Sequence, residues 1–137
     1  MTGSALLDTD VLSALMRGIP AVVDRAWRYL AEHQRLSFSL ITRYEILRGL
    51  KAKGARVQID AFARLCAASE VLPLSDEIVD VAAGVYAHLQ STGQPIGDAD
   101  ILIAATALVH DRLVVTNNED HFRRVPGVTV DNWLAPA

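Results

Sequence analysis

The sequence predicts an α/β fold with three layers, α/β/α, in which helices cover both faces of a central, mainly parallel sheet of four to five strands. Short apolar runs typical of buried strands alternate with longer amphipathic segments typical of helices. The segments between strands have about ten residues or more, enough to bring the chain back in the same direction. A length of 137 residues suits one core, and we expect residues 1–137 to form a single domain.

In the first half of the chain, we expect an apolar strand over residues 5–7 that ends at Asp8. Thr9 or Asp10 can cap the short helix that follows. The next elements are identified by apolar side chains at spacings of two for a strand and three to four for a helix. They are a helix from Pro20 to about residue 32, a strand over 36–40, a helix from Thr42 towards Gly54 and a helix from residue 57 up to Ser69.

In the second half, residues 70–74 form a strand that ends near Pro73, because proline has no N–H to donate to a neighbouring strand. Ser75 caps the next helix, and Gly93 ends it. The remaining predicted elements are a turn over 95–100, an Ala-rich buried helix over 101–109, a strand over 112–116, a capped turn over 117–122 and a last strand over 128–130.

Composition argues against several classes of protein. No apolar run approaches the roughly 18 residues of a membrane-spanning helix, and no charged and then apolar leader precedes the first strand. We therefore expect a cytoplasmic protein that does not enter the membrane. Cys66 is the single cysteine and cannot form an internal disulfide. A net charge of -3 and a pI near 5.7 do not indicate a nucleic-acid surface, although a bound divalent cation would offset part of the negative charge.

Acidic side chains follow the predicted strands. Asp8 comes directly after the first strand, Glu45 follows the second, and Asp100 begins a helix that faces the same edge. Ligands of open parallel sheets bind beyond the carboxyl ends of the strands, so these carboxylates should converge, with Asn118 or Asp120 as a fourth contributor. Several carboxylates cannot stay ionised together without a counter-charge. A cation with oxygen ligands, Mg²⁺ or Mn²⁺, is the simplest one.

Four motifs occur in order along the chain. They are Leu6-Leu7-Asp8-Thr9-Asp10, Thr42-x-x-Glu45, Pro95-Ile96-Gly97-Asp98-Ala99-Asp100-Ile101-Leu102-Ile103-Ala104-Ala105, and Val115-Thr116-Asn117-Asn118 with Phe122. Together they resemble the PIN-domain ribonucleases, specifically the VapC-type toxins of bacterial and archaeal toxin-antitoxin pairs. The likeness extends over essentially the whole chain and includes Val125-Pro126-Gly127-Val128 and Trp133 near its end.

The resemblance implies a metal-dependent endoribonuclease toxin that forms a homodimer, cuts RNA and is inhibited by a cognate antitoxin. Asp8, Glu45 and Asp100 match the three acidic positions of the family's metal site, for Mg²⁺ or Mn²⁺. At the fourth position the chain departs from the family, because Asn118 and His121 stand where an acidic residue is often found. Asp120 and Asp98 are the other possible ligands. The polar residues that match supporting positions are Thr9, Asp10, Thr42 and Thr116.

Basic residues on the predicted helix from Thr42 are candidates for phosphate contacts. They are Arg43, Arg48 and Lys51, with Lys53 on the same helix, and we add Arg123 and Arg124 from the turn after the last long strand. A solvated basic face explains the same residues equally well.

Two other functions stay open at this point. An apolar strand followed by Asp8-Thr9-Asp10 also resembles haloacid-dehalogenase-type phosphatases, in which the first aspartate is a nucleophile. In a catalytically silent binding module, the same acidic residues would only cap helices. Thr42-x-x-Glu45 can be a capping box, and Asp98 and Asp100 suit the first turn of a helix.

Overall fold

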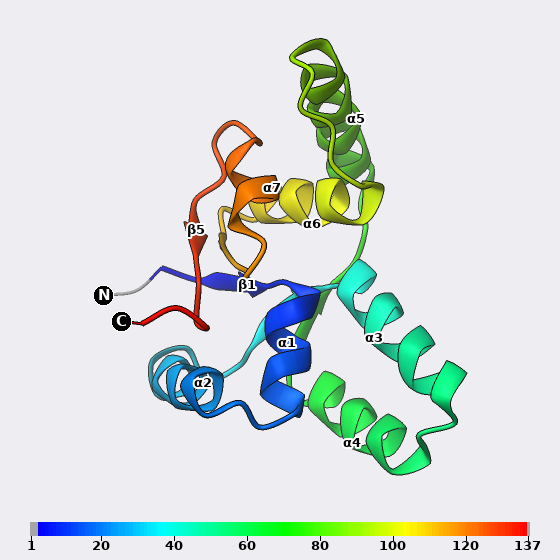
Figure 1. The fold of residues 1–137 in the computed structure, drawn as a ribbon, viewed down its shortest axis with the longest axis vertical. Coiled ribbons are helices and arrows are strands. Elements are labelled where there is room, and N and C mark those ends of the chain that lie inside the picture. Colours follow the sequence, from blue (N-terminus) through cyan, green and yellow to red (C-terminus); the bar gives the residue numbers. More distant parts are fainter. Residues whose placement is uncertain (1–2, 137) are drawn as a thin grey trace.

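The computed structural model describes residues 3–136, in which strands and helices alternate as the sequence predicts (Figure 1). The strands are β1 (Ala5–Leu7), β2 (Ser37–Ser39), β3 (Glu70–Leu72), β4 (Leu113–Val115) and β5 (Val130–Asp131). The helices are α1 (Thr9–Met16), α2 (Pro20–His33), α3 (Leu40–Lys53), α4 (Arg56–Ala67), α5 (Asp76–Ser91), α6 (Asp98–Val109) and α7 (Glu119–Arg123).

Every hydrogen-bonded strand pair within the described residues is parallel, as predicted. One group of strands has the order β1-β4-β5, with Leu6 opposite Val114, and a second group pairs β2 with β3. β1 lies against β2, so the two groups are neighbours. The central layer is therefore assembled from two short ladders, each parallel within itself.

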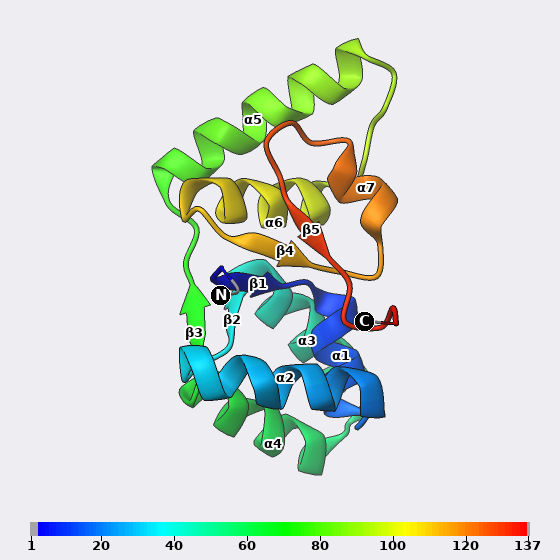
Figure 2. The ribbon, with the colours of Figure 1, turned by 90° about the vertical axis from the view of Figure 1, so that its left-hand side faces the viewer.

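Helices cover both faces of the strands, which confirms the three-layer fold. Figure 2 shows α5 and α6 on one side of the strands and α1 to α4 on the other. Consecutive strand residues point to opposite faces, and Leu7 accordingly packs in the core with α1, α2 and α4 whereas Leu6 packs with α5 and α6. A strand that is buried on both faces has an unbroken run of apolar residues in its sequence. Ala5-Leu6-Leu7 is such a run.

Three predicted helix starts differ from the structure, two of them, those of α1 and α3, because side-chain caps lie earlier in the chain. α3 begins at Leu40 and not at Thr42, since the buried Ser39 hydroxyl accepts a 3.0 Å hydrogen bond from the Ile41 N–H. α1 is capped by Asp8 and not by Thr9 or Asp10. α6 begins at Asp98, within the predicted turn. A hydroxyl or carboxylate one residue outside a helix satisfies N–H groups that otherwise lack a partner.

Two smaller predictions were also inaccurate. The last strand covers Val130–Asp131 and not 128–130, because its pairing with β4 sets Val130 opposite Val114. The predicted turn over 117–122 contains a short helix, α7, anchored by the fully buried Phe122. Pro73 does lie directly after β3, as expected. Within residues 3–136, no helix is both long and apolar enough to cross a bilayer.

Candidate functional site

Asp8 lies at the carboxyl end of β1 and is 5% exposed. One carboxylate oxygen, Oδ1, accepts a 2.7 Å hydrogen bond from the Thr9 N–H, and Oδ2 accepts one of 2.7 Å from the Thr116 hydroxyl. The pKa of Asp8 is raised to about 7, mainly by burial and in addition by the charges of Asp10 and Asp100, while the two hydrogen bonds oppose the shift. Asp8 is a buried acid that titrates near neutral pH.

Asp10 lies in the first turn of α1 and joins it to the segment after β4. Its Oδ1 accepts a 2.7 Å hydrogen bond from the Val11 N–H, and its Oδ2 accepts one of 3.0 Å from the Asn117 N–H. Burial raises the pKa of Asp10 as well. Asp10 thus holds the loop that carries Thr116 and Asn118 beside the end of β1.

Glu45 is connected to the opening strand through Thr9. The Thr9 hydroxyl donates a 2.6 Å hydrogen bond to Glu45 Oε1 and lies 3.1 Å from the hydroxyl oxygen of the buried Thr42. Glu45 Oε2 lies 3.8 Å from the Arg48 guanidinium. Because Ser39 caps α3, the interpretation of Thr42-x-x-Glu45 as a capping box is wrong. The two side chains instead face the N-terminus of α1.

Asp100, in the first turn of α6, contacts the loop and helix that follow β4. Its Oδ2 lies 2.8 Å from His121 Nδ1 and 3.5 Å from Asn118 Nδ2, and the two nitrogens are 2.8 Å apart. The Asn118 N–H donates a 2.9 Å hydrogen bond to Thr116 Oγ1. The two residues at the position where the sequence departs from the family pattern are therefore the direct partners of Asp100.

Asp8 occupies the centre of this arrangement. Thr9 connects it to Glu45, and Thr116 with Asn118 connects it to Asp100. The carboxylates are spaced by hydroxyl, amide and imidazole groups, so within residues 3–136 no three His, Cys, Asp or Glu side chains form a ready-made metal ligand set. Magnesium in proteins commonly binds one or two carboxylates and retains several waters. Asp8 and Asp100 are the candidates for such a pair, because the charge of Asp100 contributes to the raised pKa of Asp8.

Two acidic candidates lie apart from this arrangement. Asp98 lines a separate hollow of about 400 Å³ between α5 and α6, together with Val79 and Tyr86. Asp120, in α7, is exposed. Asp98 and Asp100 are two residues apart on α6, so their side chains do not share a face of the helix.

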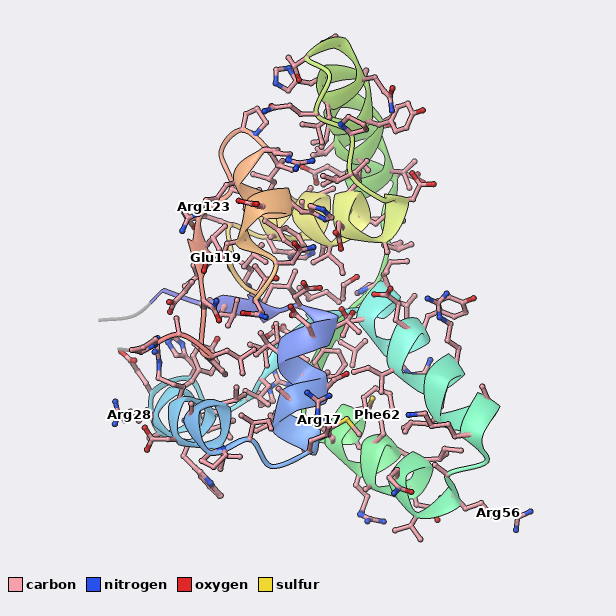
Figure 3. All side chains as sticks on the ribbon, viewed as in Figure 1. Arg17, Arg28, Arg56, Phe62, Glu119 and Arg123 are labelled. Atoms are coloured by element: carbon pink, nitrogen blue, oxygen red, sulfur yellow. The ribbon has the colours of Figure 1, made fainter. Side chains whose placement is uncertain are left out.

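Basic side chains surround the site unevenly. Arg48 stacks over the Tyr44 ring at 5.1 Å and, with Arg43 and Lys51, is exposed along α3. Arg43 also lies beside Cys66, whose thiol pKa is raised by burial and lowered by the guanidinium. In α7, Arg123 donates a 2.7 Å hydrogen bond to Glu119 (Figure 3). Arg124 donates to the Pro95 carbonyl. The three α3 cations and Arg123 are exposed, whereas Arg124 is half-buried.

A groove of about 590 Å³ runs from the site between α1, α3 and α4. Thr9 and Glu45 line it near the carboxylates, and Arg17 and Lys53 line it further along, with Met16, Leu50 and Leu65 among the apolar lining. The sequence interpretation missed Ser13 and Arg17 as groove residues. Helical spacing could have found them, since Thr9, Ser13 and Arg17 recur every four residues and so share one face of α1.

The chain belongs to the PIN-domain family, because the model of that family, the PIN domain, matches residues 5–128. This confirms the resemblance found in the motifs. Ribonuclease VapC1 of Haemophilus influenzae (strain R2866) is 28% identical over 130 residues, covering 93% of this chain and 96% of the relative.

Solved structures of similar proteins agree in fold. VapBC-1 from nontypeable Haemophilus influenzae has a TM-score of 0.82 at 28% identity, covering 96% of this chain and 98% of that one. A chain of the toxin-antitoxin complex from Klebsiella pneumoniae has a TM-score of 0.72 at 27% identity, covering 92% of this chain and 96% of that one. The α/β/α architecture is thus that of the VapBC structures.

Proposed function

We propose that this protein is an endoribonuclease toxin that hydrolyses RNA phosphodiester bonds and is inhibited by a cognate antitoxin. The ribonuclease and toxin-antitoxin names of its relatives support this proposal. The observation that carries it is the position of Asp8, which is buried at the end of β1 and connected through hydrogen bonds to both Glu45 and Asp100. A homodimer is part of the proposal.

Asp8 and Asp100 would hold Mg²⁺ or Mn²⁺ together with Glu45, which is connected to Asp8 through Thr9. Their donor atoms are carboxylate oxygens, the kind that these cations prefer. With such a cation bound, these carboxylates would position it to activate a water for attack and to offset charge on the phosphate. Asn118 lies beside Asp100 with its amide nitrogen turned toward the carboxylate, and would need to turn its amide oxygen inward to act as a ligand. Asp98 and Asp120 lie outside this hydrogen-bonded arrangement and are the weaker candidates.

The surrounding residues have distinct tasks in this proposal. Thr116 and the Thr9 N–H hold both oxygens of Asp8 in place, and the Thr9 hydroxyl orients Glu45. Asp10 fixes the Asn117 backbone, and Thr42 supports Thr9. The exposed cations of α3, Arg43, Arg48 and Lys51, would contact RNA phosphates, with Arg123 and Arg124 on the α7 side.

The two alternatives find less support. In the phosphatase interpretation, the later acidic motif follows an apolar strand, but here Asp98 and Asp100 form the first turn of α6. In the silent-module interpretation, the acidic residues are caps, but Glu45 accepts from the Thr9 hydroxyl and Asp100 contacts His121 and Asn118. Of the acidic groups discussed, Asp8 alone is an N-cap.

Cleavage of cellular RNA by purified, antitoxin-free protein tests the proposal. We expect activity with Mg²⁺ or Mn²⁺, no activity in EDTA, and a loss of at least about 100-fold in Asp8→Asn or Asp100→Asn, which is the usual scale for removing an electrostatic group from an active site. Asp80→Asn changes an exposed carboxylate of α5 by the same chemistry and should leave activity unchanged. Full activity in EDTA, or in Asp8→Asn, would contradict the proposal.

A further inference from the structure

The segment that follows β5 lies against the loop that follows β4. The two strands are paired side by side, with Val115 opposite Asp131 (Figure 2). Beyond this last strand pair, the Thr116 N–H donates a 2.9 Å hydrogen bond to the Asp131 carbonyl. The next residues along the two segments, Asn117 and Asn132, are therefore close to each other beyond the sheet edge.

The Asn132 side chain connects three parts of the chain. Its Nδ2 donates to Asn117 Oδ1 at 3.1 Å and to Glu119 Oε2 at 3.0 Å, and its Oδ1 accepts a 2.9 Å hydrogen bond from the Leu134 N–H. An amide nitrogen has two protons, and an amide oxygen can only accept. All three contacts therefore fit one orientation of the amide, because the opposite orientation would place Oδ1 against the Glu119 carboxylate.

The backbone on both sides of Asn132 is anchored away from this loop. Before it, the Asp131 carboxylate lies 3.1 Å from the guanidinium of Arg25 in α2. After it, Trp133 is 4% exposed and packs in the core, with its ring centroid 5.8 Å from that of Tyr29. Asn132 is thus fixed by an ion pair and a buried aromatic residue, and offers the loop a firm point of attachment.

The loop that Asn132 contacts carries groups of the proposed active site. Thr116 donates to Asp8 at one end of it, and Asn118 contacts Asp100 at the other. Between these two residues, the Asn117 backbone N–H donates to Asp10 in α1. The loop is therefore held on one side through its backbone, and on the other side through the contact between the Asn117 and Asn132 side chains.

We propose that Asn132 is a positioning residue, which fixes the loop over residues 116–118 and so supports RNA cleavage without contacting the RNA. This inference rests on the proposed ribonuclease function and adds to it a residue from the C-terminal segment. The local contact with the Leu134 N–H uses only the acceptor atom of Asn132, whereas holding the loop uses its donor. A substitution can therefore separate a merely structural role from the positioning role.

Asn132→Asp makes this separation, since a carboxylate still accepts from the Leu134 N–H but has no proton to donate. We expect the backbone ¹⁵N order parameters of residues 117 and 118 to fall from about 0.85, typical of rigid backbone, towards 0.6, while those of β1 and β4 stay unchanged. The value of kcat should fall about 10-fold or more, the usual effect of losing a residue that orients a metal site. KM should be unchanged, because Asn132 makes no contact with the RNA.

The substrate for these kinetics is an oligonucleotide with a site that the wild-type protein cleaves in cellular RNA, in the presence of Mg²⁺. Asn132→Ala removes the donor without adding charge and should cause the same losses as Asn132→Asp. Gln90→Glu, which adds one negative charge at an exposed position of α5, is the matched control and should behave as the wild type. Circular dichroism establishes that each variant is folded, and Asn132→Ser replaces Asn132→Asp if the latter does not fold, since a hydroxyl can also accept in such a turn.

Two results would overturn the inference. One is a loop over residues 117 and 118 that stays as rigid in folded Asn132→Asp as in the wild type. The other is a loop that becomes mobile while kcat is unchanged. A wild-type protein that cleaves no RNA with Mg²⁺ or Mn²⁺ would instead overturn the proposed ribonuclease function, and the order parameters would still decide whether Asn132 holds the loop.

Discussion

Thr116 donates a 2.7 Å hydrogen bond from its hydroxyl to Oδ2 of Asp8, across 108 residues of sequence. Thr116 follows β4 and Asp8 follows β1, and these strands are paired in parallel with Leu7 opposite Val115. Parallel pairing brings both residues to the same sheet edge. The same hydroxyl oxygen accepts from the Asn118 N–H, so Thr116 couples the buried acid to the loop that meets Asp100.

Replacing Thr116 by valine keeps the shape of the side chain and removes its hydroxyl. The Thr116 hydrogen bond lowers the pKa of Asp8, so its loss should raise that pKa above about 7. In metal-free protein, we expect the titration of Asp8 to move to higher pH and stability above pH 8 to fall by roughly 1–3 kcal/mol. Thr129→Val, at an exposed position, is the control and should change neither property.

The raised pKa of Asp8 predicts how stability changes with pH in metal-free protein. The folded state holds a proton on Asp8 up to about pH 7, whereas the unfolded chain loses it near 3.8. The stabilising contribution of this proton is complete below pH 3.8 and is lost as pH rises towards 7. Asp10, whose pKa is also raised, adds to the trend.

Urea denaturation in EDTA, from pH 4 to pH 8, measures this effect. Asp8→Asn has no titrating group at this position. The free energy of unfolding of the variant, relative to that of the wild type, should therefore increase as pH rises. This difference should not exceed about 4 kcal/mol, because the pKa of Asp8 is raised by about three units and each unit corresponds to about 1.4 kcal/mol. A constant difference between the two proteins across this range would contradict the assignment.

Truncating Phe122 should loosen the part of the site that carries His121. The ring is fully buried between α6, α7 and the strands, and Phe→Ala at such positions costs about 3–5 kcal/mol. We expect Phe122→Ala to lose this amount in chemical denaturation and to weaken Mn²⁺ binding. The control, Val57→Ala, changes a side chain that is 77% exposed and should stay within about 0.5 kcal/mol of the wild type.

The α3 cations should contribute more to RNA affinity than those of α7. In an Asp8→Asn background, Arg48→Ala with Lys51→Ala should weaken RNA binding and reduce the dependence of log K on log salt by about 0.7 per lost phosphate contact. Arg123→Ala should have less effect, because Arg123 is engaged with Glu119. Fluorescence anisotropy at several salt concentrations measures both quantities.

Arg28→Ala is the control for these arginine changes, since Arg28 lies on α2 and pairs with Asp24. An unchanged salt dependence in the α3 double variant would show that this basic face is only solvated. A larger effect of Arg123→Ala would place the RNA on the α7 side.

Local patterns in the sequence determined the order of strands and helices, the parallel arrangement and the placing of Asp8 at a strand end. These features depend on side-chain periodicity, proline and glycine, each of which acts over a few neighbouring residues. Cap positions were less accurate. The hydroxyls of Ser39 and Thr42 are equally plausible caps by composition. What separates them is that Ser39 accepts from the Ile41 N–H whereas Thr42 contacts the Thr9 hydroxyl.

The sequence by itself thus determined that Asp8, Glu45 and Asp100 would stand near one sheet edge. Only the tertiary structure decided their partners: Thr9 for Glu45, Thr116 for Asp8, and His121 with Asn118 for Asp100. The spacing of apolar residues along the sequence indicates which face of a helix or strand a residue occupies. A hydrogen bond between Asp100 and His121 requires two helices to pack to within a fraction of an ångström, and that packing is set by the whole core around Phe122.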